Sequence, residues 1–156
     1  MFKKILVLTS IFILGTSCGF KIVDYSETSN FIITKIETSG NNKVNYNLKK
    51  KLQRLSNSNG TKNITLIFSS EINKNIKEKN IKNEITKYKL ELVTNVTYKI
   101  LSDLTENTLT IKVSGDYLVT KKYSQTLINE KELIKNLTNE LAKKITRKLM
   151  QNLNDT

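Results

Sequence analysis

The sequence predicts an α+β domain in which two amphipathic helices pack on one face of a four-stranded sheet, in the order β-α-β-β-β-α. Two stretches, 88–100 and 109–120, alternate apolar and polar residues, which is typical of strands with one buried and one solvated face. Two others, 44–55 and 129–153, repeat apolar residues at helical spacing. Because such helices can cover the apolar face of a sheet, the pattern predicts two layers.

A strand and an amphipathic helix open the domain. Apolar residues mixed with threonines between 31 and 38 indicate the strand, and Ser-Gly-Asn-Asn at 39–42 ends it. The helix that follows has an apolar face and a basic face. Its apolar positions are Val44, Leu48, Leu52 and Leu55, and its basic ones are Lys49, Lys50, Lys51 and Arg54. We expect this helix to end near the loop-forming residues 56–60.

Three strands are expected next, separated by a loop and a turn. Ile64, Leu66 and Phe68 share one side of the second strand, and the charged stretch Asn73 to Asn83, which has little periodicity, predicts a solvated loop. The third strand is predicted to bury Tyr88, Leu90, Leu92, Val96, Tyr98 and Ile100. After a turn at 103–107, the fourth strand is predicted to bury Leu109, Ile111, Val113, Tyr117 and Val119.

A long helix is expected to close the chain. Asn129 is its predicted N-cap, and Glu132 three residues later matches the reciprocal capping arrangement. The apolar stripe consists of Ile134, Leu137, Leu141, Ile145, Leu149 and Leu153. Glutamates lie early in this helix and lysines late, which suits the helix macrodipole. With no internal repeat and no linker, residues 31–156 are expected to form one domain.

The first residues have the pattern of a secretory leader that ends in a bacterial lipoprotein cysteine. Lys3 and Lys4 form a basic tip, an apolar run follows to Leu14, and small residues precede Cys18, the only cysteine. The run is shorter than the roughly 20 apolar residues of a permanent membrane span. We therefore predict a signal peptide at 1–17 and a lipidated N-terminus and tether at 18–30.

Two details of this leader bear on the lipoprotein interpretation. Gly15 stands three positions before the cysteine, where lipoproteins usually have an aliphatic residue, so an ordinary signal peptide followed by an unmodified cysteine is the alternative. Gly19 follows the cysteine in place of the aspartate that commonly retains lipoproteins at the inner membrane. The expected location is the outer membrane, lipid-anchored on its periplasmic side.

The chain is strongly basic, with 26 Lys and Arg against 14 Asp and Glu and a formal charge of +12. Such a charge attracts anionic partners, but a sequence so rich in Lys, Asn and Ile also reflects an AT-rich genome, and both interpretations stand. Nucleic acid is not expected as a partner, because an exported lipoprotein rarely meets it and no Arg-rich stripe is present. The polyanion available at an outer membrane is lipopolysaccharide.

The composition argues against catalysis. The chain has no histidine, and its sole cysteine is assigned to the lipid, which removes the commonest general base, the commonest transition-metal ligand and a thiol nucleophile. The carboxylates Asp103, Glu106 and Asp116 fall at turn or solvated-face positions. We expect a non-enzymatic protein with no catalytic residues, no metal and no cofactor.

Four segments of the sequence carry a resemblance to a known family. The sharpest is the mature start, Cys18-Gly19-Phe20 followed by a short polar-apolar segment to Asp24. The other segments are the third strand from Tyr88 to Tyr98, the stretch Tyr117 to Asn129, and the last helix with Leu141-Ala142 and Ile145 to Leu149. Together they span most of the mature chain, and they resemble the LptE family of lipopolysaccharide-assembly lipoproteins.

The resemblance implies a domain that sits as a plug inside the outer-membrane β-barrel LptD, assists assembly of that barrel, binds lipopolysaccharide and delivers it to the outer leaflet. It implies acyl chains such as palmitate on Cys18. It also implies lipid-contacting basic residues near two places in this chain, where Lys79 and Lys82 and then Lys121 and Lys122 lie. Solvated surface charges are the alternative for all four lysines.

Three other functions stay open from the residues alone. The first is a generic outer-membrane lipoprotein that acts as an adaptor of another envelope assembly, and the second is a stand-alone lipid-binding lipoprotein with a pocket between helices and sheet. The third, an exported hydrolase, is disfavoured by the absence of histidine. Co-purification with one large barrel at equal stoichiometry would distinguish the LptE-like function from the other three.

Overall fold

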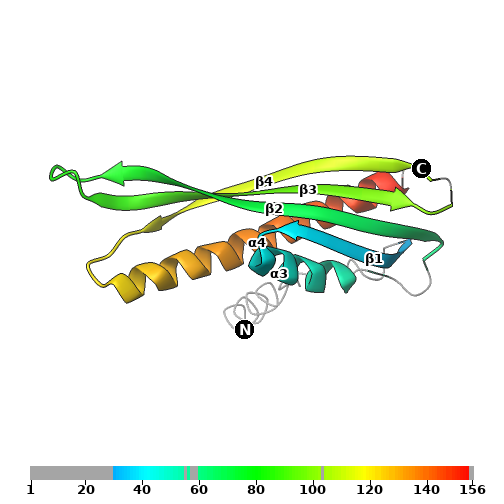
Figure 1. The fold of residues 1–156 in the computed structure, drawn as a ribbon, viewed down its shortest axis with the longest axis horizontal. Helices are drawn as coiled ribbons and strands as arrows, with labels where there is room; N and C mark the ends of the chain where they lie inside the picture. Colours follow the sequence, from blue (N-terminus) through cyan, green and yellow to red (C-terminus); the bar gives the residue numbers. More distant parts are fainter. Residues whose placement is uncertain (1–29, 55, 57–59, 103, 155–156) are drawn as a thin grey trace, which may run out of the picture.

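The computed structural model describes residues 30–54, 56, 60–102 and 104–154, and it confirms the predicted fold class and element order. The elements are β1 (Phe31–Gly40), α3 (Asn42–Gln53), β2 (Lys62–Lys79), β3 (Ile85–Ile100), β4 (Glu106–Leu118) and α4 (Tyr123–Asn154). Both helices lie on the same side of the sheet (Figure 1). The predicted signal peptide, Cys18 and the tether up to residue 29 lie outside the described residues.

The sheet is mixed, with strand order β1-β2-β3-β4. β1 pairs with β2 in parallel, whereas β2–β3 and β3–β4 are antiparallel. A parallel pair needs a crossover connection, and α3 provides it between β1 and β2. The antiparallel β2–β3 pairing is the longest, from Ile64 opposite Ile100 to Lys79 opposite Ile85.

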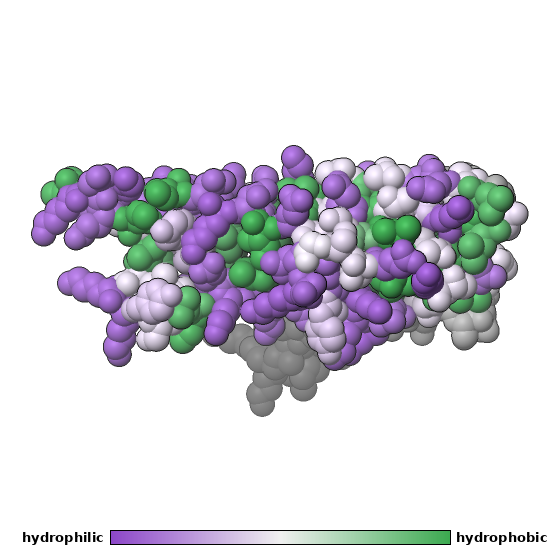
Figure 2. All heavy atoms as spheres, in the orientation of Figure 1, coloured by the Kyte–Doolittle hydropathy of each residue, from purple (hydrophilic) through white to green (hydrophobic). Residues whose placement is uncertain are grey.

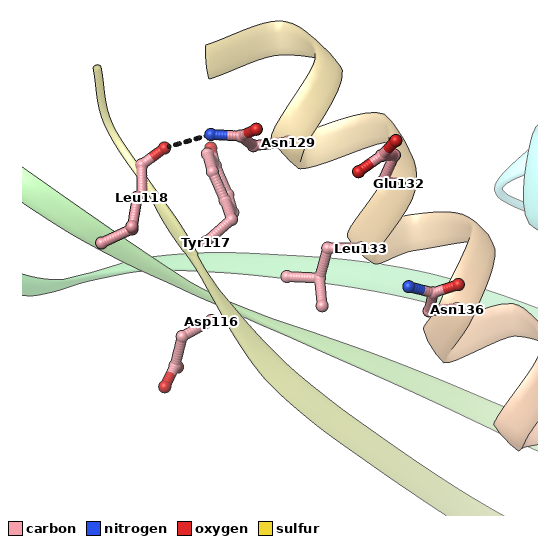
Figure 3. Close-up of a pocket in the computed structure, with 7 residues that line it drawn as sticks. All are labelled: Asp116, Tyr117, Leu118, Asn129, Glu132, Leu133 and Asn136. Carbon is pink, nitrogen blue, oxygen red and sulfur yellow. Dashed lines mark hydrogen bonds between the residues drawn. The ribbon is translucent and has the colours of Figure 1, made fainter. Parts of the chain in front are cut away.

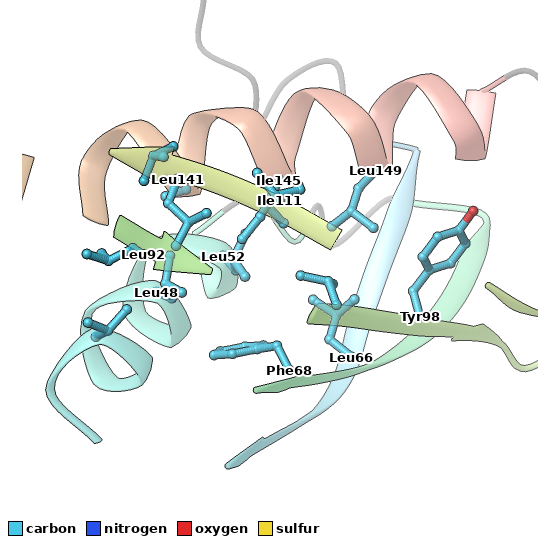
Figure 4. Packing of buried hydrophobic residues seen from close by; sticks show 14 of the residues in the cluster. Leu48, Leu52, Leu66, Phe68, Leu92, Tyr98, Ile111, Leu141, Ile145 and Leu149 are labelled. Carbon is cyan, nitrogen blue, oxygen red and sulfur yellow. The ribbon is translucent and has the colours of Figure 1, made fainter. Parts of the chain in front are cut away.

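The core lies between the inner face of the sheet and the two helices (Figure 4). Leu90, Leu92 and Val96 of β3 are fully buried, and so are the predicted apolar residues of β2. The helices contribute the residues Leu48, Leu52, Leu141, Ile145 and Leu149. Burying one such side chain stabilises a fold by roughly 1.5–3 kcal/mol. The alternation in the sequence therefore identified the covered face of the sheet correctly.

The predicted solvated loop from Asn73 to Asn83 is wrong. β2 continues to Lys79, paired with β3, and only residues 80–84 form the turn. In that turn the side-chain carbonyl of Asn80 accepts the backbone N–H groups of Lys82 and Glu84, at 2.9 and 3.0 Å. The segment has little apolar periodicity because most of it is exposed, yet its backbone hydrogen bonds to β3 still make it a strand.

The last helix begins at Tyr123, so the predicted N-cap at Asn129 is also wrong. The Asn129 amide lies in the second turn of α4 and donates a hydrogen bond to the carbonyl of Leu118, at 3.0 Å. At the true start, the hydroxyl of Thr126 accepts the backbone N–H of Thr120, at 2.9 Å. Asn129 thus fastens the helix to the end of β4 rather than capping it.

The sheet is longer than the helices that cover it. At about 3.3 Å per strand residue and 1.5 Å per helix residue, β2 spans roughly 59 Å, α4 roughly 48 Å and α3 roughly 18 Å. The β2–β3 hairpin reaches past the end of β4 and well past α3 (Figure 1). At the hairpin, inner-face positions therefore have less helix above them than in the core.

Gly40 is required where β1 turns into α3. Its φ is +83°, and a Cβ there would lie 2.4 Å from the carbonyl oxygen of Ser70. That oxygen already accepts the backbone N–H of Asn41, at 2.7 Å. No side-chain rotation can relieve this contact, because the position of a Cβ is fixed by the backbone of residue 40 and the oxygen belongs to the backbone of Ser70.

We expect Gly40→Ala to lower the free energy of unfolding by about 1–3 kcal/mol, the usual cost of forcing a side chain into this backbone region. Gly115→Ala is the matched control. Its Cβ would be too close only to a methyl group at the end of the Leu133 side chain, at 2.8 Å, and in ordinary contact with Leu137, at 3.5 Å, so a smaller loss is expected. Urea unfolding followed by circular dichroism measures both, and equal losses would contradict the assignment.

Candidate ligand-binding site at the hairpin end

The four lysines assigned from the family resemblance lie at one end of the molecule. We call it the hairpin end and define it as residues 74–88 and 116–130. Lys79 ends β2 and Lys82 lies in the hairpin turn, while Lys121 and Lys122 lie between β4 and α4. The backbone N–H of Val119 donates to Thr86, at 2.9 Å, which places this connection beside the hairpin. No hydrogen bond joins the two lysine pairs within the described residues.

These four lysines differ from the others at this end in having no carboxylate partner among the residues that the structure describes. Lys74 pairs with Glu130, Lys77 with Asp116, and Lys87 with Glu78. The remaining carboxylate, Glu84, accepts the side-chain amide of Asn80, at 2.7 Å. The remaining lysines are Lys79, whose ammonium donates to Asn83 at 2.9 Å, and Lys82, Lys121 and Lys122. All four are exposed and available to an external anion.

Apolar side chains are also exposed at the hairpin end. Of nine large apolar residues that are exposed in the described part of the chain, five lie here. They are Ile76, Ile81, Leu118, Tyr123 and Ile128. Ile81, at the tip of the turn between Asn80 and Lys82, is fully exposed. Figure 2 shows apolar residues among hydrophilic ones at this end. Single exposed apolar residues are ordinary, but five of the nine lie at this one end of the molecule, which makes it a candidate interaction region.

Lys74 anchors the hairpin end to α4. Its ammonium lies 4.5 Å from the ring centre of Tyr88, 5.3 Å from that of Tyr117, and 3.1 and 3.2 Å from the carboxylate oxygens of Glu130. The two tyrosine rings stack with centres 5.6 Å apart. A cation over aromatic faces and beside a carboxylate is held by both. Lys74 was not among the residues predicted from the sequence, because the segment 73–83 was expected to be a loop.

The contacts of Lys74 shift two pKa values. Burial lowers the pKa of Lys74, but Tyr117 and Glu130 outweigh that effect and raise it above 10.5. Burial raises the pKa of the Tyr117 hydroxyl above 10.0, with Lys74 opposing and Glu130 adding to the shift. Both groups therefore favour their protonated forms in the folded state.

A cleft of about 300 Å³ lies beside the hairpin end, between the edge of β4 and α4 (Figure 3). It is lined by Asp116, Tyr117, Leu118, Asn129, Glu132, Leu133 and Asn136. With two carboxylates and no lysine in its lining, this cleft does not attract phosphate. The candidate anion-binding groups are therefore the exposed lysines, not the cleft.

The sequence also offered three carboxylates as candidates for catalysis. Asp116 is paired with Lys77, Glu106 is the first residue of β4, and Asp103 lies outside the described residues. Within the described ranges, no group of three Asp, Glu, His or Cys residues is placed to hold a metal ion. Nor does any helix in those ranges combine the length and apolarity needed to cross a membrane.

No family model matches the chain, and no curated protein matches its sequence. Solved structures share its fold. A candidate lipoprotein of Caulobacter crescentus CB15 superposes with a TM-score of 0.54 at 17% identity, covering 77% of this chain and 90% of that one. The uncharacterized lipoprotein B of Nitrosomonas europaea gives 0.54 at 13% identity, covering 87% and 93%. Rare lipoprotein B of Shewanella oneidensis gives 0.48 at 13% identity, covering 78% and 94%. The chain thus has a fold found in bacterial lipoproteins.

The Lys74 cluster predicts a loss of stability at alkaline pH. A group whose pKa is raised in the folded state stabilises fully below its unfolded value, and that contribution is lost as the pH rises through the folded value. We expect the free energy of unfolding to fall as the pH rises above 10.0, the ordinary pKa of tyrosine, and 10.5, that of lysine.

Urea unfolding at a series of pH values from 9 upward, in high salt to screen exposed ion pairs, measures this slope. The double variant Lys74→Met/Tyr117→Phe should have a shallower slope than the wild type. Lys89→Met, which removes an exposed lysine of β3, serves as the control and should keep the wild-type slope. An unchanged slope in the double variant would contradict the role of the cluster.

Proposed function

We propose that this chain is a non-catalytic outer-membrane lipoprotein, anchored through Cys18, that partners an LptD-type β-barrel and assists lipopolysaccharide assembly and transport to the outer leaflet. The leader pattern and the LptE resemblance in the sequence support this proposal. So does the fold, which is shared with two structures named as lipoproteins at a TM-score of 0.54. The anchor would hold the domain at the periplasmic surface, because several buried acyl chains bind a membrane durably.

One observation carries the lipopolysaccharide part of the proposal. At the hairpin end, the four lysines without a carboxylate partner lie among exposed apolar side chains, with Ile81 next to Lys82. Lysine binds phosphate as a point charge, and exposed apolar groups favour contact with acyl chains. An amphiphile with phosphates beside its acyl chains matches both kinds of group, and lipopolysaccharide is that kind of amphiphile.

The outer face of the sheet supports the barrel partner. It carries threonine and asparagine side chains that hydrogen-bond across strands, such as Thr97 with Thr108 at 3.0 Å and Thr110 to Asn95 at 2.7 Å. The interior of a large outer-membrane barrel is polar, so a polar face of this kind suits its lumen. The helices, on the other side, would be free for other contacts.

The barrel partnership predicts the outcome of a pull-down from detergent-solubilised outer membranes. We expect the tagged full chain to bring down one large β-barrel at equal stoichiometry, identified by mass spectrometry. A Cys18→Ser chain is the control for membrane anchoring and should be recovered outside the membrane fraction. A mixture of unrelated envelope proteins with no dominant barrel would favour the adaptor function instead.

The lysines predict the outcome of a binding measurement. We expect Lys79→Glu/Lys82→Glu/Lys121→Glu/Lys122→Glu to raise the apparent dissociation constant for lipopolysaccharide by at least about tenfold in low salt, since four cations near a phosphorylated surface act together. Single exposed ion pairs contribute only about 0–1 kcal/mol, so single variants should change little.

The matched control reverses four exposed lysines elsewhere. These are Lys35, Lys49, Lys112 and Lys148, all outside the hairpin end. This control changes the net charge by the same amount, so it should lose much less affinity if the hairpin end is the site. Circular dichroism should show both variants folded. Equal affinity losses would contradict a localised site, and unchanged binding in low salt would reject it.

A further inference from the structure

A second basic feature lies in the helix layer, outside the hairpin end as defined. A groove of about 370 Å³ runs where α3 and α4 meet. It is lined by Lys43, Asn47 and Lys51 of α3 and by Lys131, Lys135, Thr138 and Asn139 of α4. Residues four apart share one face of a helix, so each helix contributes one row of polar side chains. The groove lies between these two rows.

The groove contains four lysines and no carboxylate. α3 has no acidic residue anywhere in its length. The glutamates of α4 are engaged elsewhere: Glu130 pairs with Lys74, Glu140 pairs with Lys144 at 2.8 Å, and Glu132 lines the cleft beside β4. Within the described residues, none of the four groove lysines forms an ion pair.

A concave surface lined by one sign of charge concentrates its field and draws counter-ions into it. Each row extends over nine residues, which are eight steps of 1.5 Å or about 12 Å, longer than a single phosphate group. Three neutral side chains complete the lining. The Asn47 amide already donates one hydrogen bond to the backbone carbonyl of Lys43, at 3.1 Å, so its second N–H and the amide of Asn139 can donate to a bound anion. The hydroxyl of Thr138 already donates to the carbonyl of Ile134, at 2.7 Å.

We propose that this groove binds a lipid headgroup that carries two phosphate groups. Lysine is suited to phosphate as a point charge, and two rows of lysines match two phosphates better than one. Basic pockets between transmembrane helices bind anionic lipid headgroups, and this groove places the same kind of charge between two helices of a membrane-anchored domain. The inference requires only that the chain works at a membrane surface, and it is independent of the barrel partner and of the hairpin-end lysines.

The lining favours a lipid over nucleic acid. Proteins that bind single strands combine a basic track with aromatic side chains on which bases stack. No aromatic residue lines this groove. Tyr46, the aromatic side chain of α3, instead lies beneath the ammonium of Lys50, at 5.2 Å.

The test uses the full chain in an uncharged detergent, with dispersed cardiolipin as the probe that carries two phosphates and phosphatidylglycerol as the probe that carries one. We expect cardiolipin to bind more tightly than phosphatidylglycerol at equal phosphate concentration. Lys43→Gln/Lys51→Gln/Lys131→Gln/Lys135→Gln should raise the dissociation constant for cardiolipin by at least about tenfold.

The matched control is Lys49→Gln/Lys50→Gln/Lys143→Gln/Lys148→Gln. It removes two lysines from each helix, as the groove variant does, but none that lines the groove. A loss of less than about threefold is expected there, because exposed charges act weakly and are screened. The hairpin-end charge-reversal variant should also keep its cardiolipin affinity, which separates this inference from the proposed lipopolysaccharide site.

Four outcomes would overturn the proposal. They are equal losses in the groove and control variants, equal affinity for the two lipids, tighter binding of free pyrophosphate than of cardiolipin, and tighter binding of a short single-stranded DNA. If the groove variant does not fold, chemical shifts of the wild-type chain replace it. Cardiolipin should then shift the side-chain amide signals of Asn47 and Asn139 first, and unshifted signals would refute the site.

Discussion

The structure depends on how much of one sheet face the two helices cover. Under α3 and α4, the inner-facing positions of the strands are mostly apolar or hydrogen-bonded, and the buried pair Ser70 and Thr94, whose hydroxyls lie 2.8 Å apart, is of the second kind. The buried hydroxyl of Tyr117 is an exception, with no hydrogen-bond partner among the described residues. Beyond α3, where only α4 lies over the sheet, the requirement is relaxed. Lys74 takes an inner-facing position there and remains compatible with the fold because its ammonium contacts two tyrosine rings and Glu130 of α4. The uncovered length of the β2–β3 hairpin is thus what makes a charged and partly apolar surface available for function.

The same constraint explains which elements could be predicted from the sequence. β3 and β4 were predicted well because burial of one face imposes strict alternation on them. The second half of β2 was missed because its side chains are mostly exposed and therefore show no apolar alternation. Its backbone hydrogen bonds to β3 keep it extended, and such bonds do not depend on the type of side chain. The start of α4 was misplaced for a related reason. Its first turns contact the end of β4 through hydrogen bonds of Thr126 and Asn129. Asparagine is common at N-caps, but Asn129 lies in the second turn of the helix.

The candidate site was accessible from the sequence only in part. The positions of Lys79, Lys82, Lys121 and Lys122 came from a family resemblance, and periodicity alone gave no reason to select them from so many lysines. Their common property is the lack of a carboxylate partner among the described residues, which only the folded structure reveals. Lys77 and Lys87 lie on the same hairpin, but they form ion pairs with Asp116 and Glu78. Ion pairing between strands depends on register, and the register of this hairpin was hidden by the error over the second half of β2.

The distribution of charge bears on whether the basic composition serves a function. An AT-rich genome can raise the number of lysines, but it does not decide where they lie or where glutamates are absent. The two helices together hold ten Lys and Arg residues against three glutamates, a net charge of +7, whereas the whole chain carries +12. They supply more than half of the net charge from 44 of the 156 residues. Strands and helices hold nine lysines each, as compositional bias would give, but the strands hold six carboxylates and the helices only three. The shortage of carboxylates in the helix layer, around a groove that has none, favours an anionic partner on the helix side of the molecule.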